Sequence, residues 1–514
     1  MWCGWPTVLL LVAYFVTKGE AIGCVSRRFG EDRTVCVCNA TYCDEIPDND
    51  PKIPSRGSLY WYVSSKEGLR MSMAKARFNS CTTSNNDATT LYINTTRRYQ
   101  RVFGFGGAFT DSAGINIKKL SLAAQEQLLR TYYDPNVGSR YILARVPIGG
   151  TDFSTRPYTY DDYSNDTTLE HFSLAQEDYE YKIPIMKRAL ELNPKLRFLS
   201  SSWSAPPWMK TNGRINGFGF LKEEFYQIYA EYLVKFLDEY KKNGLNMWAI
   251  TTGNEPLDAF VPCDVLNTMG WTPETMGKWV GDNLGPTLAS TGNNQTLIFA
   301  LDDQRINLPW YPEALFRNKK ALKYTSGIAI HWYVDNLTPA TVLDQTHDDF
   351  PEKLLLLTEA SAGSGILDYP KVLLGSWDRG ESYILSIIEY MNHWSIGWLD
   401  WNIALDQSGG PNWIQNFVDS PIIVNPETDE FFKQPMYYAL AHFSRFVDRN
   451  SIRTSITSTE DIKSAAFLTP SKEVVAVLYN GMDTVANIVL QDLDKDPICL
   501  QLPARSMNTI IYAQ

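Results

Sequence analysis

The sequence predicts an α/β protein: a (β/α)8 TIM barrel with a second, smaller antiparallel β-domain built from both ends of the chain. Two observations support this fold. Between residues 98 and 445, eight short apolar runs alternate with segments of helical periodicity. Both ends of the chain instead place apolar residues at every second position, as in residues 473–479, which is typical of antiparallel strands.

The eight apolar runs have the composition of buried parallel strands. Between them lie amphipathic segments, such as 121–133 and 223–242, that suit the connecting helices. A doubly wound open sheet is the competing fold. The glycine-rich stretch 104–109 lacks the spacing of a dinucleotide-binding loop, which favours the barrel. The predicted strands are 102–108, 141–148, 197–203, 247–255, 296–302, 327–333, 353–360 and 396–402.

The change of pattern along the chain predicts its domain boundaries. We interpret residues 1–23 as a signal peptide, 24–97 as a cysteine-rich β segment, 98–445 as the barrel and 446–514 as further strands. Neither end is long enough to form a β-sandwich alone. We therefore expect the two ends to pair into one domain.

The first residues resemble a cleaved leader more than a membrane span. An apolar run of about ten residues precedes small residues such as Gly19 and Ala21. Because a span needs about 20 apolar residues, an uncleaved anchor is the less favoured alternative. No later stretch reaches that length, so we expect no transmembrane segment.

Cysteines and sequons indicate the same export route. Four cysteines crowd into residues 24–43, which indicates disulfides; the alternative, a zinc site, would have no histidine nearby. Seven cysteines follow the leader, so at least one thiol is left free or intermolecular. The candidate N-glycosylation sites are Asn39, Asn94, Asn165, Asn294 and Asn336.

Charge and histidine content exclude several classes of function. The formal net charge of −11 argues against nucleic acid as a partner, and against an anionic membrane as a strongly attracted one. The chain has only five histidines and none is paired at ligand spacing, so we expect neither a catalytic metal nor another cofactor. A serine nucleophile would lack its GxSxG turn, and Cys263 has no supporting motif.

The remaining chemistry lies at the carboxyl ends of the predicted strands, where barrels place their reactive groups. These ends are rich in carboxylates and aromatic rings. They supply Asp111, Arg145, Trp203, Asn254, Glu255, Asp302, Asp303, His331, Trp332, Tyr333, Glu359, Asp400, Trp401 and Asn402.

Glu255 and Glu359 are the best candidates for a catalytic pair. Pro256 is expected to hold Glu255 in an extended conformation at the end of the fourth strand. Glu359 closes the apolar run of the seventh strand. The two carboxylates can then meet over the barrel mouth, where a retaining glycosidase needs them about 5–5.5 Å apart and an inverting one about 6.5–9.5 Å. Arg145 is a candidate cation for keeping Glu359 charged.

Aromatic residues on the same predicted face suit a sugar, whose ring presents apolar C–H surfaces. For any one of these rings, packing in the core is the alternative. The candidate aromatic residues are Trp203, Trp332, Tyr333, Trp401 and Trp413, with Asp111, Asn254 and Asn416 to bond hydroxyls.

An ordered set of motifs extends from the end of the leader almost to the C-terminus. It includes CVCNATYCD, GFGGAFTDSAG, RVPIGGTDF, WMKTNG, GNEP, LDDQR, HWYVD, TEASAGS, LGSWDRG, DWNIAL and GGPNWIQNFVDSPIIV. In these motifs the chain resembles the glucosylceramidases of glycoside hydrolase family 30.

The resemblance implies roles for individual residues. Glu255 would be the acid/base and Glu359 the nucleophile. It also implies the bridges Cys24–Cys36 and Cys38–Cys43, and a long loop, 403–434, packed on the N-terminal segment. With the strand-end residues Arg145, His331 and Tyr333, the expected substrate-binding residues are Asp111, Trp203, Asn254, Trp401 and Asn416.

The implied activity is hydrolysis of glucosylceramide to glucose and ceramide by double displacement, in the lysosome lumen or after secretion. Expected partners are anionic lipid, a saposin-type activator and a lysosomal sorting receptor. Residues 257–269 depart from the vertebrate pattern, with Asp264 and Leu266 replacing aromatic residues, and Ser361 replaces a cysteine. The alternatives are a same-fold enzyme acting on a glucosylated sterol, a β-glucan or a xylan, and a non-catalytic binding protein, which would normally have lost one carboxylate.

Overall fold

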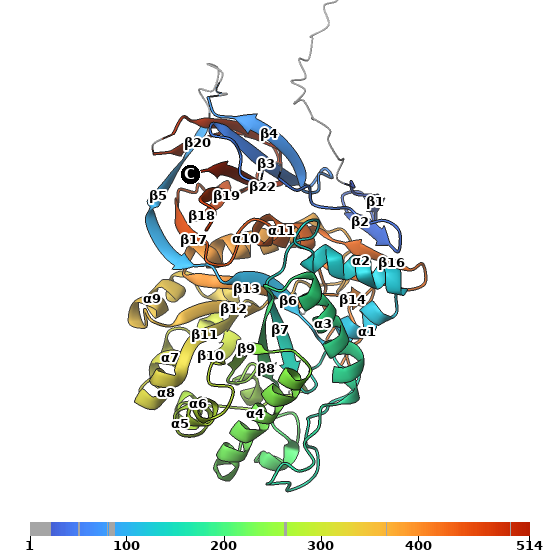
Figure 1. Ribbon diagram of the computed structural model, residues 1–514, viewed down its shortest axis with the longest axis vertical. Helices are drawn as coiled ribbons and strands as arrows, with labels where there is room; N and C mark the ends of the chain where they lie inside the picture. The colour runs from blue at the N-terminus through green and yellow to red at the C-terminus, as the bar shows by residue number, and fades with distance from the viewer. Residues whose placement is uncertain are drawn as a thin grey trace, which may run out of the picture.

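The computed structural model describes residues 22–49, 52–79, 81, 88–261, 265–365, 367–493 and 495–514. Nearly all of the predicted leader and Cys263 lie outside this part of the chain. The molecule has two main parts along its long axis: a barrel with its helices, and a β-domain at the other end, with α10 (Trp377–Asn392) and α11 (Pro435–Ser444) between them (Figure 1).

The barrel is closed and all eight of its strands are parallel, in the order β10-β11-β12-β13-β6-β7-β8-β9. The predicted (β/α)8 fold is therefore confirmed. The strands are β6 (Gly104–Ala108), β7 (Leu143–Ile148), β8 (Arg197–Ser202), β9 (Met247–Thr251), β10 (Leu297–Gln304), β11 (Thr325–His331), β12 (Leu354–Glu359) and β13 (Ser395–Asn402).

Glycine allows β6 to pack closely against its neighbour β7. A Cβ atom at Gly106 would lie 1.6 Å from the carbonyl oxygen of Leu143, a distance that no side chain tolerates. The repeated glycines of this strand therefore follow from barrel closure, not from a nucleotide site.

The helices lie on the outside of the barrel and connect successive strands along the chain. The remaining helices are α1 (Asp111–Lys118), α2 (Leu122–Tyr133), α3 (Ile183–Leu192), α4 (Tyr226–Lys242), α5 (Pro273–Trp279), α6 (Gly285–Ser290), α7 (Trp310–Leu315), α8 (Lys319–Tyr324) and α9 (Thr341–Asp349). Among the described residues, no helix combines the length and apolarity needed to cross a bilayer.

The β-domain is a nine-stranded sheet built from both ends of the chain, in the order β21-β20-β5-β17-β18-β19-β22-β3-β4. The disulfide Cys81–Cys499, which the sequence did not predict, ties the two ends together. The pairing is antiparallel except between β5 and β20, which run parallel. The strands are β3 (Ser58–Ser65), β4 (Ser72–Arg77), β5 (Thr89–Arg101), β17 (Ile452–Ile456), β18 (Ile462–Leu468), β19 (Glu473–Asn480), β20 (Ala486–Asp492), β21 (Ile498–Leu502) and β22 (Ser506–Ala513).

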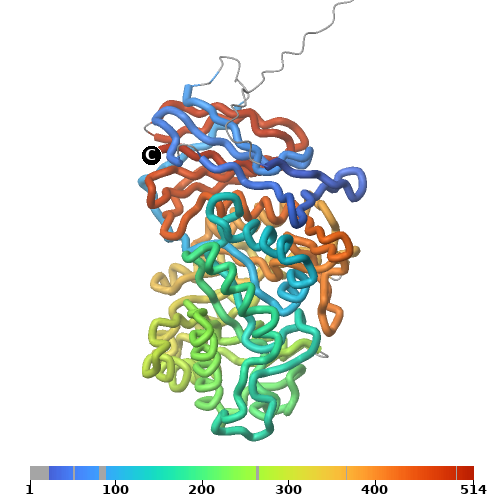
Figure 2. Tube along the Cα trace, turned by 45° about the vertical axis from the view of Figure 1, so that its right-hand side comes forward, coloured from blue at the N-terminus to red at the C-terminus, as the bar shows by residue number. Residues whose placement is uncertain are grey.

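The first two strands do not join this sheet. They form a separate five-stranded sheet, in which β2 pairs antiparallel with β16. The blue segment that contains β1 and β2 thus lies beside the orange segment that follows β13 (Figure 2). This sheet contains β1 (Ser26–Arg28), β2 (Thr34–Asn39), β14 (Leu405–Asp406), β15 (Ile422–Asn425) and β16 (Glu430–Lys433).

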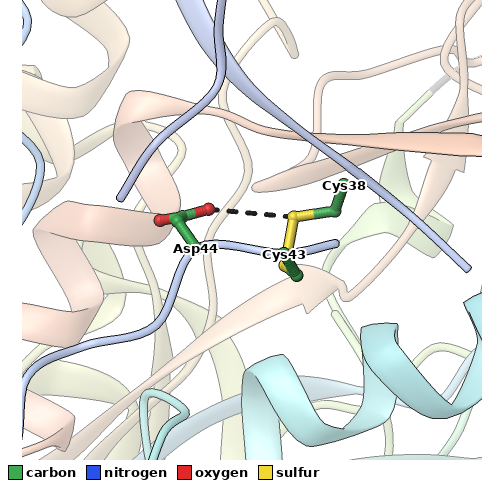
Figure 3. Close-up of side chains that lie close together, drawn as sticks. All are labelled: Cys38, Cys43 and Asp44. Atoms are coloured by element: carbon green, nitrogen blue, oxygen red, sulfur yellow. Dashed lines mark hydrogen bonds between the residues drawn. A yellow bond between two sulfur atoms is a disulfide. The ribbon is translucent and has the colours of Figure 1, made fainter. Parts of the chain in front are cut away.

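The bridges Cys24–Cys36 and Cys38–Cys43 are both present in this region. Asp44 lies beside the second bridge, with Oδ1 3.7 Å from Sγ of Cys38 (Figure 3). The Asp44 carboxylate is buried, paired with Lys433 at 3.0 Å and accepting a hydrogen bond from Tyr438 at 2.7 Å. Because both sulfurs are in a disulfide, this group is not a metal site.

Three of the five sequons have exposed asparagines, Asn165, Asn294 and Asn336. Asn39 and Asn94 are half-buried, and each accepts a hydrogen bond from the hydroxyl of its own sequon threonine.

Candidate active site

In most strands of the barrel, the inward-facing side chains change from apolar to polar or aromatic toward the carboxyl end. An apolar layer contains Leu143, Leu199, Ala249, Phe299, Ala329, Leu356 and Leu399. Because alternate residues share a face, the residues two positions further on point inward in the next layer. In six of these seven strands that residue is polar or aromatic, namely Arg145, Ser201, Thr251, His331, Thr358 and Trp401. We call these six side chains, together with Asp302, the polar layer.

Glu359 lies directly above the polar layer, at the end of β12. The buried guanidinium of Arg145 forms an ion pair with its Oε2, and the Tyr333 hydroxyl donates to its Oε1 at 2.8 Å. Arg145 lies within β7, earlier in the strand than the sequence predicted, but it has the partner expected of it. The Arg145 guanidinium and the Tyr333 hydroxyl together fix the position of this carboxylate from two sides.

Glu255 follows β9, and its backbone is not extended as predicted. Its φ is +40°, in the left-handed region, so the constraint expected from Pro256 did not decide its conformation. The turn is held by two main-chain hydrogen bonds of 2.9 Å, from Glu255 to Asp302 and from Asn254 to Ser202. This unusual backbone aims the carboxyl group over the barrel mouth.

One oxygen of the Glu255 carboxyl group contacts two nitrogen atoms that can donate hydrogen bonds. Oε1 lies 2.7 Å from both Gln304 Nε2 and His331 Nδ1. Burial raises the pKa of Glu255, with a further contribution from Glu359, while His331 and Asp258 act in the opposite direction. For His331, burial alone would lower the pKa, but the surrounding carboxylates raise it to about 10.

The structure brings the two glutamates together. One carboxylate oxygen of Glu255, one of Glu359 and a ring nitrogen of His331 all lie within 4.8 Å of one another. This separation is nearer to the spacing of about 5–5.5 Å in retaining glycosidases than to the spacing of about 6.5–9.5 Å in inverting ones.

Other residues that the sequence predicted to bind substrate surround this pair. Trp203 and Trp401 stack with ring centroids 5.2 Å apart, and the Arg145 guanidinium lies over both rings. Asn254 accepts a hydrogen bond from Arg145 at 2.7 Å. The two indoles thus form one aromatic wall next to the carboxylates.

Asp111 is buried at the first turn of α1, a helix capped by Thr110. Its Oδ2 accepts hydrogen bonds from Ser154 and Tyr158 at 2.6 and 2.9 Å. Its Oδ1 has no hydrogen-bond partner among the described residues, and Lys182 lies 3.5 Å away. Burial raises the pKa of Asp111, while Lys182 lowers it.

Asn416 belongs to a rim loop anchored on Asp152, which follows β7. Asn416 and Asn412 both donate to Asp152 Oδ2, at 3.1 and 3.0 Å. Trp413 donates to the Thr151 carbonyl at 3.0 Å. Burial raises the pKa of Asp152 to about 7, so the anchor of this loop changes charge near neutrality.

Trp332 does not join the aromatic wall. Its ring packs edge-on against Tyr383 and Trp398, toward α10 and β13. Trp332 therefore packs in the core, which was the alternative to sugar binding for each of these aromatic residues.

Exposed aromatic side chains gather on the loops after β8 and β9. Phe218 is 66% exposed and Phe260 45% exposed, and together with Phe220 they make edge-to-face contacts at 5.0–5.9 Å. The two loops pair with each other through Phe220 and Gly270. Phe260 of this aromatic cluster (Phe218, Phe220 and Phe260) lies five residues after Glu255. We did not predict the cluster from the sequence.

Several residues of the site had no signal in the sequence strong enough to assign them. Gln304 and Asp302 belong to the LDDQR motif, but nothing in that motif shows that a bulge turns Asp302 inward. Asp152 and the hydroxyls of Ser201, Thr251 and Thr358 also gain their importance only from three-dimensional proximity.

Two groups of described residues have the spacing of metal ligands. One is the disulfide with Asp44. The other is Glu255, His331 and Glu359, where the Arg145 cation already pairs with Glu359 and His331 stays protonated near neutrality. These positive charges make the second group unsuited to a metal ion.

Comparison with known proteins decides the family. Residues 102–447 match the Glycosyl hydrolase family 30 TIM-barrel domain, and residues 450–510 the Glycosyl hydrolase family 30 beta sandwich domain. The chain belongs to glycoside hydrolase family 30. It is therefore a glycosidase.

The similarity of this family 30 enzyme to known proteins covers almost its whole length. The lysosomal acid glucosylceramidase of Mus musculus is 41% identical over 95% of both chains. SrfJ from Salmonella typhimurium has the same fold with a TM-score of 0.82 and 26% identity, covering 89% of this chain and all of that one. The endo-β1,6-glucanase BT3312 has a TM-score of 0.79 and 25% identity, covering 90% of this chain and all of its own.

Proposed function

We propose that the chain is a retaining β-glucosidase that hydrolyses glucosylceramide to glucose and ceramide. The observation that carries this proposal is the approach of the Glu255 and Glu359 carboxylates to within 4.8 Å. Two carboxyl groups at this spacing suit attack by one of them on the sugar, through a covalent intermediate.

In the first step, a carboxylate oxygen of Glu359 attacks the anomeric carbon. The bond to the ceramide oxygen breaks, and Glu255 gives its proton to that oxygen. Oε1 of Glu255 already faces two donors, which assigns the transferable proton to Oε2. Burial raises the pKa of Glu255, which keeps it protonated for this step.

In the second step, water attacks the anomeric carbon of the glucosyl ester. Glu255, now a carboxylate, accepts the proton of that water, and the ester bond to Glu359 breaks. Arg145 and Tyr333 contact Glu359 throughout, so they stabilise the carboxylate as it leaves.

The glucose subsite would consist of Asp111, Asn254 and the aromatic wall of Trp203 and Trp401. The Asp111 carboxyl, whose Oδ1 is 3.5 Å from Lys182, would accept a sugar hydroxyl, and the indoles would face the apolar side of the ring. Asn416 would close the rim from its loop on Asp152.

The substrate assignment rests on the 41% identical mouse glucosylceramidase and on the exposed aromatic cluster beside Glu255. Exposed apolar rings at this edge suit a lipid aglycone better than a polar one. The assignment implies sphingolipid catabolism in the lysosome lumen or after secretion. Anionic lipid, a saposin-type activator and a sorting receptor would be its partners.

A β1,6-glucanase activity is the second candidate, because the endo-β1,6-glucanase BT3312 shares the fold over its whole length. A glucan would present a second sugar to the aromatic cluster where glucosylceramide presents a lipid. The catalytic pair would be the same in both cases.

A substrate panel at acid pH tests the proposal. We expect hydrolysis of a fluorogenic β-glucoside, and of glucosylceramide in detergent with anionic lipid, together with little release of glucose from β1,6-glucan. Turnover of the glucan with none of glucosylceramide would reject the substrate; no turnover of any β-glucoside would reject the function.

A further inference from the structure

Asp302 lies between the two side chains that contact the proposed catalytic pair. Its Oδ2 accepts a hydrogen bond from Arg145 Nη2 at 2.7 Å, and its Oδ1 is 3.1 Å from His331 Nε2. Arg145 in turn contacts Glu359, and His331 contacts Glu255. Asp302 is thus joined to each glutamate through one intermediate side chain.

Three hydroxyl groups complete the surroundings of Asp302. Ser201 and Thr251 donate to Oδ2 at 2.6 and 2.8 Å, and Thr358 donates to Oδ1 at 2.6 Å. With Arg145 and His331, five donors from five different strands converge on one carboxylate. An ionised carboxylate has about four lone-pair sites, so Asp302 is saturated as an acceptor.

A bulge in β10 places Asp302 among these donors. Asp302 is skipped in the register with β11, and φ is +75° at Leu301 and +58° at Asp302. Without the bulge, Leu301 would occupy the inward position of the polar layer, two residues after Phe299. Leu301 instead packs in the core outside the apolar layer. Bulges of this kind re-aim side chains beside active sites, and positive φ at residues other than glycine persists only where the surrounding structure holds it.

We infer that Asp302 is a positioning residue for the proposed hydrolysis, because it orients Arg145 and His331 so that they hold Glu359 and Glu255 face to face. The inference rests on the proposed function. No part of the sequence resemblance assigned this residue a role. The same residue also accepts the main-chain N–H of Glu255 through its carbonyl, which fixes the acid/base from a second side.

A charge effect accompanies the geometric one. Burial raises the pKa of Asp302, but Arg145, His331 and the hydroxyls hold it well below its usual range. Its negative charge helps keep His331 protonated, and a protonated His331 stabilises the Glu255 carboxylate. The charged or titratable groups facing this cluster are Arg145 of β7, Glu255 and Asp258 after β9, Asp303 of β10, His331 of β11, Tyr333 after β11 and Glu359 of β12.

The test is the variant Asp302→Asn, assayed as the full chain on a fluorogenic β-glucoside across a range of pH. The amide keeps the shape but turns an N–H group toward a cluster of donors. We expect kcat/KM to fall about 10²-fold, the loss typical of misplaced catalytic groups. Loss of the Asp302 charge lowers the pKa of His331. Once His331 is neutral, the Glu255 carboxylate loses its cationic partner, so the pKa of Glu255 rises and the basic limb of the pH profile moves to higher pH.

Asp44→Asn is the matched control. Asp44 is a buried carboxylate with a cation and a hydroxyl as partners, but it lies in the five-stranded sheet region. We expect Asp44→Asn to lower the melting temperature while kcat/KM and the pH profile of the folded enzyme stay unchanged. A purely structural role for Asp302 would give this same result.

A milder variant keeps the test decisive if Asp302→Asn does not fold. Thr251→Val removes one of the donors to Asp302 without changing its charge, and we expect a smaller loss of kcat/KM. Wild-type protein without β-glucosidase activity would reject the proposed function. An active wild type, with only a few-fold loss and an unmoved basic limb in the folded variant, would overturn the role of Asp302 alone.

Discussion

Two buried histidines, one in each part of the molecule, have pKa values shifted in opposite directions. His331 in the barrel mouth and His442 on α11, against the nine-stranded sheet, are both fully buried. Carboxylates raise the pKa of His331 to about 10, whereas burial among hydroxyls lowers the pKa of His442 to about 3. The partners of His442 are Thr509 and Ser64, at 2.8 and 3.0 Å.

The difference extends to the surrounding strands. In the nine-stranded sheet, β18, β19 and β22 pair in unbroken register and bury mainly apolar residues. In the barrel, β10 is bulged and Glu255 and Asp302 have positive φ. The sheet gains stability from apolar packing and regular pairing. The barrel mouth instead keeps charged side chains buried on a strained backbone, as is typical of functional sites.

The largest expected effect is confined to the mouth. Glu359→Gln removes the proposed nucleophile, so we expect kcat/KM to fall by roughly 10⁴-fold or more on every β-glucoside. Steady-state kinetics with a fluorogenic substrate measures this. Substantial residual hydrolysis by pure, folded variant would show that another group attacks the sugar.

Glu255→Gln should give a loss that depends on the leaving group. We expect about 10²–10⁴-fold for glucosylceramide, which needs a proton, and much less for an activated aryl glucoside. Azide should partly restore turnover by forming a glucosyl azide. Equal losses on both substrates, without rescue, would contradict an acid/base role.

In the sheet, the same kind of test should affect stability alone. Leu478 of β19 is fully buried in the apolar core, so Leu478→Ala should lower the free energy of unfolding by about 2–5 kcal/mol. The kcat/KM of the folded fraction should stay at the wild-type value. A large fall in that value would show that the two regions are coupled.

The smallest effects concern the pH dependence of stability. The raised pKa of His331 stabilises the fold below about pH 6.5, and this contribution is lost as pH rises toward 10. The lowered pKa of His442 has the opposite sign: neutral His442 is fully stabilising above about pH 6.5, and this is lost as pH falls toward 3. Urea titrations of His331→Gln and His442→Gln at several pH values measure both slopes. If both substitutions changed the pH dependence of the free energy of unfolding in the same direction, the proposed contrast between His331 and His442 would be wrong.

The barrel and its mouth could be predicted because reactive residues lie at or near the carboxyl ends of the strands, and periodicity locates the strands. Glu359 ends β12 as this rule expects, whereas Arg145 lies inside its predicted strand and not at its end. The rule failed at Glu255, where hydrogen bonds to neighbouring strands overrode the local preference set by Pro256. It also gave no role to Asp302, because a one-residue bulge is invisible in the apolar pattern. The pairing of β1 and β2 with β16 likewise depends on contacts far apart in the chain.

The stereochemistry of hydrolysis tests the central claim most directly. Proton NMR of the first sugar released from a β-glucoside distinguishes the two anomers before they equilibrate. Carboxylate oxygens within 4.8 Å of each other suit the proposed double displacement, so we expect β-glucose as the first product. Initial release of α-glucose would mean a single displacement by water, and would contradict the pairing of Glu255 with a nucleophilic Glu359.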